Sequence, residues 1–216
     1  MIAIDGPVAS GKTSVGRALA VRLGYRFVDT GLMYRALTRL ALRRGVPLDD
    51  ESALERLAAE VQVQIVDGSG GSARVLADGD DVTDELRSPE IDAAVSEVSQ
   101  VAAVRRAMVA EQQRIAESGR VVMVGRDIGT KVLPGAVKLY LAASKAERVR
   151  RRHAELAADG SALSIERVRE NVELRDRLDS SRAEGPLRMA ADALRVETDG
   201  LDVEGVVDTV VSLISS

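Results

Sequence analysis

The 216-residue sequence contains no cysteine, no tryptophan and one histidine, and aromatic residues make up only 2% of it. Without cysteine the chain can form neither disulfides nor thiolate metal sites, and a single histidine argues against a histidine-based metal centre. No apolar run approaches the roughly 18 residues that a membrane-spanning helix needs. Met1 leads directly into an apolar segment, without the basic region that begins a signal peptide. We therefore expect a cytoplasmic protein without a membrane partner.

The formal net charge is −4, which argues against a general nucleic-acid-binding protein. A hydrophobic fraction of 45% and a charged fraction of 30% are typical of a globular domain with one sizeable core. The positive charge is uneven, since ten arginines lie between Arg148 and Arg188. Arginine holds phosphate oxygens bidentately. The cluster is therefore either a solvated helix face or a surface that faces a polyphosphate.

Near the N-terminus the sequence matches the pattern G-x-x-x-x-G-K-[ST] of a P-loop. The pattern follows an apolar run at 2–4 and precedes an amphipathic helical pattern. Glycines let backbone N–H groups close around phosphate oxygens, and the helix N-terminus and Lys12 add positive charge. Either Thr13 or Ser14 would supply the hydroxyl near Mg²⁺, the one cofactor that we expect. The segment predicts a nucleoside triphosphate site made by Gly6, Pro7, Val8, Ala9, Ser10, Gly11, Lys12, Thr13 and Ser14.

Apolar runs typical of buried parallel strands alternate with helical patterns along the chain. The runs lie at 2–4, 26–28, 121–124, 137–141 and 194–196. The helical patterns between and after them include 32–43, 101–117, 145–158, 165–179 and 203–214. This alternation predicts an α/β fold, with a parallel five-stranded sheet and helices on both faces.

One stretch, 61–82, breaks the alternation. Apolar and polar residues alternate there around glycine turns at 68–71 and at Gly79. Such a pattern predicts a small antiparallel meander. It is too short to carry a large core, so we interpret it as an insertion into the α/β fold.

Two polar clusters follow predicted strands. The cluster at 29–35 ends in Tyr34 and Arg35. By itself it indicates a capped amphipathic helix with Arg35 on its surface. Beside a P-loop, however, Arg35 could hold an acceptor phosphate. The cluster at 125–130 places Arg126 and Asp127 between glycines, directly after the most apolar strand. Because ligands of open parallel sheets bind at the carboxyl ends of strands, we interpret this pair as functional, with a structural salt bridge as the alternative.

A third cluster, 175–182, closes the arginine-rich stretch. On a helix, Arg175, Asp179 and Arg182 would fall at i, i+4 and i+7, on one face. That spacing suits either a lid that faces a phosphate or a plain surface row of ion pairs.

In this order the clusters resemble those of the cytidylate kinases, bacterial CMP kinases within the nucleoside monophosphate kinase family. The resemblance covers nearly the whole chain. The segment 29–35 is similar to the family's D-[ST]-G-x-x-Y-R motif, 125–130 to its G-R-D-x-G-T motif, and 175–182 to its R-D-x-x-D-x-x-R lid segment. The meander lies where the family carries an insertion that short adenylate kinases lack. The resemblance implies a monomer that phosphorylates CMP and dCMP to CDP and dCDP, by direct in-line transfer from ATP.

The resemblance also implies roles for single residues. Acceptor-phosphate arginines fall on Arg35, Arg126 and Arg182, and Lys12, Arg126 and Arg182 would be catalytic. The implied CMP site as a whole comprises Thr30, Tyr34, Arg35, Ser96, Arg105, Gly125, Arg126, Asp127, Arg175, Asp179 and Arg182; candidates in the lid are Arg148, Arg151 and Arg152.

Three parts of the chain are implied by the same resemblance. They are a core of residues 1–29, 118–145 and 189–216, an acceptor-binding subdomain of about 30–117 with a β insertion at about 61–96, and a lid of about 146–188.

Within the implied site, Ser96, Arg105 and Asp127 would contact cytosine. A carboxylate suits the N4 amine, while a guanidinium and a hydroxyl suit the acceptors N3 and O2. Uracil would place a carbonyl against Asp127 and an N–H against Arg105. We therefore expect CMP to be a good acceptor and UMP a poor one.

Two other classes of protein stay open on the sequence alone. The first is a kinase of the same fold that acts on UMP, AMP or shikimate. The second is a nucleotide-binding regulator, for which a guanine-binding N-K-x-D motif would be expected. The only asparagine, Asn171, is followed by Val172, so that motif is absent.

Overall fold

The computed structural model describes residues 1–67 and 73–215. Its main sheet has five parallel strands in the order β2-β6-β1-β7-β8, so the predicted fold class and its five strands are confirmed. The strands are β1 (Ile2–Asp5), β2 (Arg26–Asp29), β6 (Val121–Gly125), β7 (Val137–Ala142) and β8 (Leu194–Glu197). The central strand β1 leads into the P-loop, which therefore begins at the carboxyl edge of the sheet.

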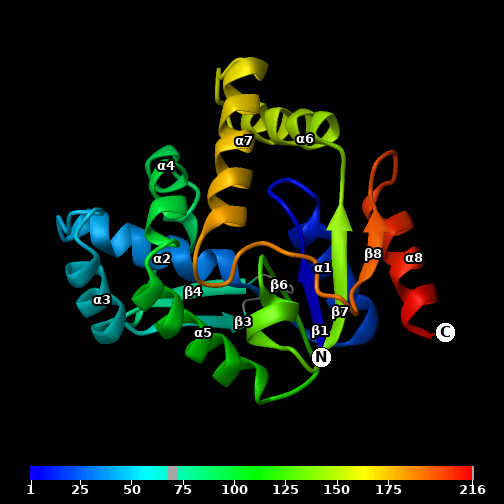
Figure 1. Ribbon diagram of the computed structural model, residues 1–216, viewed down its shortest axis with the longest axis horizontal. Helices are drawn as coiled ribbons and strands as arrows, with labels where there is room; N and C mark the ends of the chain where they lie inside the picture. The colour runs from blue at the N-terminus through cyan, green and yellow to red at the C-terminus, as the bar shows by residue number, and fades with distance from the viewer. Residues whose placement is uncertain (68–72, 216) are drawn as a thin grey trace.

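Helices cover both faces of this sheet (Figure 1). Successive residues of a strand point to opposite faces. Ile2 and Ile4 accordingly pack with α1 and α8 on one face, whereas Ala3 packs with α2 and α5 on the other. The helices are α1 (Lys12–Leu23), α2 (Thr30–Arg43), α3 (Glu51–Glu60), α4 (Pro89–Val98), α5 (Ala102–Ala116), α6 (Lys145–Ala158), α7 (Ile165–Ser181) and α8 (Val203–Ser215).

Two of these helices, α3 and α4, were not among the predicted patterns. Their starts nevertheless carry local signals. Asp50 caps α3 by accepting from the Ala53 N–H, and Ser88 caps α4 by accepting from the Ile91 N–H. Pro89 occupies the first turn of α4, where a missing N–H costs nothing.

The predicted meander forms a separate antiparallel sheet, β3-β4-β5. Its strands are β3 (Val63–Asp67), β4 (Ala73–Ala77) and β5 (Asp80–Asp81). The expected glycine turn at 68–71 lies outside the described residues. The last strand ends at Asp81, and the 3-10 turn Thr83–Glu85 and α4 come after it. Ile65 and Val75 join the core that also holds α2, which fixes this sheet against the main body.

The helices α6 and α7 stand beyond the carboxyl edge of the main sheet, at the top of Figure 1. A small core joins them to the P-loop, because Val8 packs with Val149 of α6 and with Val168 and Val172 of α7. None of the helices in the described parts of the chain is long and apolar enough to cross a membrane.

Candidate active site

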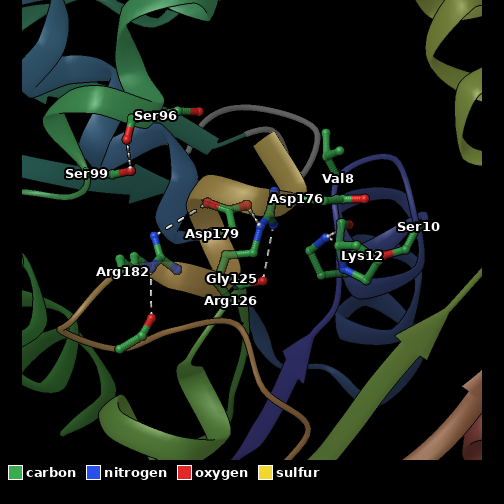
Figure 2. Close-up of polar contacts among 12 residues, drawn as sticks. Val8, Ser10, Lys12, Ser96, Ser99, Gly125, Arg126, Asp176, Asp179 and Arg182 are labelled. Carbon is green, nitrogen blue, oxygen red and sulfur yellow. Dashed lines mark hydrogen bonds and ion pairs between the residues drawn. The ribbon is translucent and has the colours of Figure 1, made fainter. Parts of the chain in front are cut away.

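The P-loop curls around its own lysine. Gly11 has φ of +92°, a left-handed conformation that glycine adopts without strain, and α1 begins directly after it. Lys12 Nζ donates to the Pro7 carbonyl at 2.6 Å and to Ser10 Oγ at 3.3 Å, as Figure 2 shows. Burial lowers the pKa of Lys12 well below its usual value, and Arg126 lowers it further. A polyphosphate would offset both effects, since an anion favours the charged ammonium.

Thr13 and Ser14 differ in what surrounds them. The Thr13 hydroxyl donates to Asp29 Oδ2 at 2.8 Å, whereas the Ser14 side chain is exposed. Asp29 ends β2 and also caps α2, by accepting from the Gly31 N–H at 3.0 Å. The hydroxyl and carboxylate are the hard oxygen donors that Mg²⁺ prefers. The hydroxyl of Thr13 and the carboxylate of Asp29 thus have the chemistry to hold such a cation. The described residues contain no cluster of three metal-ligating side chains.

Arg126 lies at the carboxyl end of β6 and reaches α7. Its Nε donates to Asp179 at 2.6 Å, and its Nη1 donates to the Gly125 carbonyl at 3.3 Å. Asp179 also faces Arg182 at 3.5 Å, so one carboxylate lies between two guanidinium groups (Figure 2). Burial tends to raise the pKa of Asp179, but Arg126 and then Arg182 outweigh it and hold that pKa below its usual value.

Two arginines near this group have buried nitrogen atoms without a hydrogen-bond partner among the described residues. They are Arg175, at Nε, and Arg182, at Nη2. Burial, with Arg126 and Arg35 nearby, lowers the pKa of Arg175 to about 10. Since a buried donor without an acceptor is costly, these nitrogen atoms and the surrounding positive charge suit an anion.

Asp92 of α4 connects two more arginines. It pairs with Arg35 of α2 and with Arg152 of α6. Burial tends to raise the pKa of Asp92, but Arg35 and Arg152 outweigh this effect and hold it below its usual value. The carboxylate therefore occupies a place between the two arginines where an anionic ligand would also be stabilised.

Of the other two lid candidates, Arg148 contacts the donor loop directly, and Arg151 contacts Thr198, whose hydroxyl donates to the Ser10 carbonyl of that loop at 3.4 Å. Arg148 donates to the Val8 carbonyl at 3.2 Å and to both oxygens of Asp176, at 3.0 and 2.7 Å. Arg151 donates to Thr198 Oγ1 at 2.9 Å and to its carbonyl at 2.6 Å. The α6 arginines thus contact the donor side through Arg148 and Arg151 and the acceptor side through Arg152.

Arg105 and Asp127 form a buried pair, with a 2.5 Å contact and side-chain exposures of 3% and 7%. Arg105 lies over the Tyr34 ring, 5.5 Å from its centre, and donates to the Ser99 carbonyl at 3.4 Å. Ser99 Oγ in turn donates to the Ser96 carbonyl at 3.0 Å. The two charges that could contact a base thus satisfy each other.

Gly125 allows the two halves of the site to approach. A Cβ at this position would lie 2.7 Å from Thr30 Oγ1, closer than atoms can pack. Thr30 uses that space to donate to the Val124 carbonyl at 2.9 Å. The start of α2 is thereby held against the end of β6.

A cavity of about 1580 Å³ opens between α1, α2, α4 and the lid helices. Of the predicted site residues, the cavity lining includes Val8, Thr13, Ser14, Arg35, Ser96, Arg152 and Arg175. Other predicted site residues are buried; they include Lys12, Tyr34, Arg105, Asp127, Arg148, Asp179 and Arg182. Seven of the predicted residues therefore line one space, while Arg105 lines a second, smaller cavity.

The cytidylate kinase family model matches residues 2–216. The chain belongs to the cytidylate kinase family. Among its relatives, a cytidylate kinase of Pelotomaculum thermopropionicum is 47% identical, over 100% of this chain and 96% of the relative. A cytidylate kinase of Geobacillus kaustophilus is 48% identical, with 99% and 96% covered.

Solved structures show the fold more broadly. A shikimate kinase from Bacteroides thetaiotaomicron aligns with a TM-score of 0.50 at 14% identity, covering 100% of this chain and 98% of that one. At this identity the likeness concerns the fold alone, a P-loop kinase fold. The relatives at 47% and 48% identity favour the cytidylate kinase assignment over a shikimate kinase.

The last cluster, 175–182, only partly has the helical geometry that its spacing predicted. Arg175 and Asp179 lie on α7, but the helix ends at Ser181 and Arg182 has an extended backbone (ψ of 145°). Its Nε donates to the Gly185 carbonyl at 2.9 Å, which turns the chain back toward Asp127. Arg182 thus reaches the site from the loop after the helix.

Several polar residues of the site were missed from the sequence. They are the acidic partners Asp5, Asp92 and Asp176, together with Thr198. Asp5 directly precedes the P-loop, so its place at a strand end was a usable signal. The others lie on helices or loops whose pairing depends on the tertiary fold.

Proposed function

We propose that the protein transfers the γ-phosphoryl group of ATP directly and in line to CMP or dCMP, giving ADP and CDP or dCDP. Membership of the cytidylate kinase family supports phosphorylation of CMP by ATP. The observation that carries the choice of acceptor is the buried Arg105–Asp127 pair, which lies beside the arginine cluster of Arg126 and Arg182. The reaction belongs to pyrimidine nucleotide metabolism and would take place in the cytoplasm.

On the donor side, the P-loop amides and Lys12 would hold the β- and γ-phosphates. Lys12 now donates to the Pro7 carbonyl, and a phosphate oxygen would replace that weaker neutral acceptor. Arg148 would support the same loop from the lid directly, and Arg151 would do so through Thr198, which donates to the Ser10 carbonyl. Phosphoryl transfer needs positioning and charge neutralisation rather than covalent help, and this set supplies both.

Thr13 would contact Mg²⁺ that enters with ATP, with Asp29 as its hydrogen-bonded neighbour. The ion would neutralise charge on the donor phosphates. Ser14 is less suited because its side chain is exposed.

On the acceptor side, Arg35, Arg126, Arg175 and Arg182 would surround the CMP phosphate. The unpartnered atoms of Arg175 and Arg182 would gain hydrogen bonds, and Arg126 and Arg182 would follow the charge as the phosphoryl group crosses. The attacking phosphate oxygen is ionised at neutral pH, so no general base is required. All of these residues lie on one chain, which is consistent with a monomer.

Cytosine would separate the Arg105–Asp127 ion pair and would offer each of the two side chains a new hydrogen-bond partner. Asp127 would accept from the N4 amine, while Arg105 and Ser96 would donate to N3 and O2. Uracil would leave both charges badly matched, and buried unmatched charges discriminate strongly. Thr30, Tyr34, Gly125 and Asp179 would shape and orient this half of the site.

The test is an ADP-release assay with ATP–Mg²⁺ and a panel of acceptors: CMP, dCMP, UMP, AMP and shikimate. We expect high kcat/KM for CMP and dCMP, and a value for UMP lower by about 100-fold or more. Equal values for CMP and UMP would contradict the proposal.

A further inference from the structure

Asp5 is a buried carboxylate that the proposed phosphoryl transfer does not use. It is the last residue of β1 and directly precedes Gly6 of the P-loop. Its side chain bonds to the segment after β6: Oδ1 accepts from the Ile128 N–H and Oδ2 from the Gly129 N–H, both at 2.8 Å. Burial raises the pKa of Asp5 to about 6, and the two amide hydrogen bonds act against that rise. A charge in such a place has an energetic cost, so its two hydrogen-bond partners are informative.

The two amides begin a single π-helical turn, Ile128–Val132, that comes directly after Asp127. The turn is tightened by bonds from the Lys131 and Val132 amides to the Asp127 carbonyl, at 2.8 and 3.3 Å. A residue at the start of a helical turn commonly caps it with its own side chain, and aspartate is among the best at this. Asp127 makes no such cap. Asp5 satisfies the turn's first amides instead, from a neighbouring strand.

Because Asp5 caps the turn, the Asp127 carboxylate is available to pair with Arg105. We infer that Asp5 is a positioning residue for acceptor recognition: by capping the turn after Asp127, it keeps the Asp127 carboxylate directed at Arg105 and at the base. The inference rests on the proposed CMP kinase activity. It gives the last residue before the donor loop a role in choosing the acceptor.

Asp5→Asn removes half of the cap. One amide oxygen can still accept an N–H, but the side-chain NH₂ would face the other backbone donor. The freed turn would then compete with Arg105 for the Asp127 carboxylate. We expect KM for CMP to rise about ten- to hundredfold, the CMP/UMP ratio of kcat/KM to fall, and KM for ATP to stay within about twofold of the wild-type value.

Asp192→Asn is the matched control. Asp192 is an exposed partner of Lys138, whose stem lies against Gly129 in the same turn. The Asp192→Asn variant removes a negative charge near the turn but leaves the hydrogen bonds between Asp5 and the turn intact. We expect wild-type kinetics from it.

A double variant tests the path of the effect. With Asp127→Asn already present, adding Asp5→Asn should change the CMP/UMP ratio little, because both act through one side chain. Hydrogen exchange at the Gly129 amide should be faster in Asp5→Asn than in the wild type.

The outcomes separate the two proposals. If the wild type fails to phosphorylate CMP, the proposed function fails. If the wild type is active but Asp5→Asn raises KM for ATP at least as much as that for CMP, Asp5 only supports the P-loop and the inference is overturned. If Asp5→Asn does not fold, Asp5→Ser, which keeps one acceptor and adds no amide donor, is measured in the same way. Failure of both to fold would make Asp5 a folding residue and would also overturn it.

Discussion

At the scale of single residues, the site is defined by positive charge that the protein itself leaves partly unmatched. Arg126 has a carboxylate partner in Asp179, but Arg175 and Arg182 keep buried nitrogen atoms without one among the described residues. A folded protein rarely leaves such donors unsatisfied unless a ligand supplies the acceptor. The acceptor phosphate is the ligand that the proposed reaction provides.

Arg182→Ala tests this charge directly. Removing the guanidinium should lower kcat by about 10³-fold, because the group stabilises charge that develops as the phosphoryl group crosses. The measurement is steady-state ADP release with CMP, accompanied by a thermal unfolding curve to show that the fold is intact. Arg188→Ala, at an exposed arginine six residues further on, is the control and should retain wild-type turnover. Near-normal kcat in Arg182→Ala would mean that Arg182 has no catalytic role.

Asp5 also predicts a pH dependence of stability. Its pKa is about 6 in the folded protein, against an ordinary value of 3.8. The native state therefore binds a proton between these values that the unfolded chain does not, so the free energy of unfolding falls as the pH rises through this window. Relative to Asp5→Asn, the wild type should gain about 2 kcal/mol between pH 7 and pH 4.

The measurement is urea unfolding of both proteins at several pH values. Other carboxylates are common to the two proteins and cancel in the difference. A difference that does not change with pH would show that Asp5 titrates normally.

At the scale of elements, the lid is attached to both halves of the site by ion pairs and hydrogen bonds. Arg148 connects α6 to the P-loop through the Val8 carbonyl. Asp92 connects α6 to α4 and, through Arg35, to α2. Closing a lid excludes water that would otherwise accept the phosphoryl group, so these connections bear on catalysis as well as on stability.

Asp92→Asn should loosen the lid on the acceptor side. We expect amide hydrogen exchange in α6 to become about five- to tenfold faster, since a partly buried ion pair of about 1 kcal/mol is lost. Glu173→Gln is the control, because the Lys145–Glu173 pair joins α6 only to α7, within the lid. Exchange in α6 that is unchanged in Asp92→Asn, or equally increased in Glu173→Gln, would argue against a connection through Asp92.

The elements that the sequence predicted well are those whose pattern repeats. All five strands of the main sheet lie where apolar runs predicted them. The signal is clearest for β1 and β6, because strands buried on both faces leave a continuous apolar run. The short helices α3 and α4 were missed, since ten residues of mixed character give a weak periodicity, and a capping residue alone does not distinguish a helix start from a turn.

In the candidate site, too, some residues could be predicted from the sequence and others could not. Residues in motifs at strand ends, such as Lys12 and Asp127, could be located because the sheet brings strand ends together. The partners that satisfy them could not. Arg105 and Asp127 are 22 residues apart in the sequence, and Asp5 is 123 residues from Ile128, whose amide it caps. No local sequence pattern encodes contacts over such separations.

At the scale of the whole molecule, one sheet edge carries the residues proposed to bind both substrates. The P-loop comes after β1 at the centre, Asp29 ends β2, and Arg126 comes after β6 between them in the sheet. The donor and acceptor groups are therefore fixed to adjacent strands of one rigid body, while the lid helices supply groups from the other side. The protein as a whole carries a net charge of −4, whereas the site has a local excess of arginine. This charge distribution favours the binding of anions at the site rather than elsewhere on the surface.

This arrangement predicts how ligands and metal act on the stability of the whole protein. ATP at 100 times its Kd should stabilise the fold by about 2.7 kcal/mol. For a chain of this size that corresponds to a rise in Tm of roughly 5–10 °C. Because the described residues hold no three-ligand metal cluster, we expect EDTA to leave Tm unchanged without nucleotide and to remove most of the shift with it.

Thermal unfolding with and without ATP, Mg²⁺ and EDTA distinguishes the possibilities, and CMP alone serves as the control. Its shift should not respond to EDTA, since the acceptor phosphate is expected to bind arginines such as Arg126 and Arg182 rather than a metal ion. A Tm that falls with EDTA in the absence of nucleotide would reveal a resident metal ion and would contradict the assignment of Mg²⁺ to the donor nucleotide.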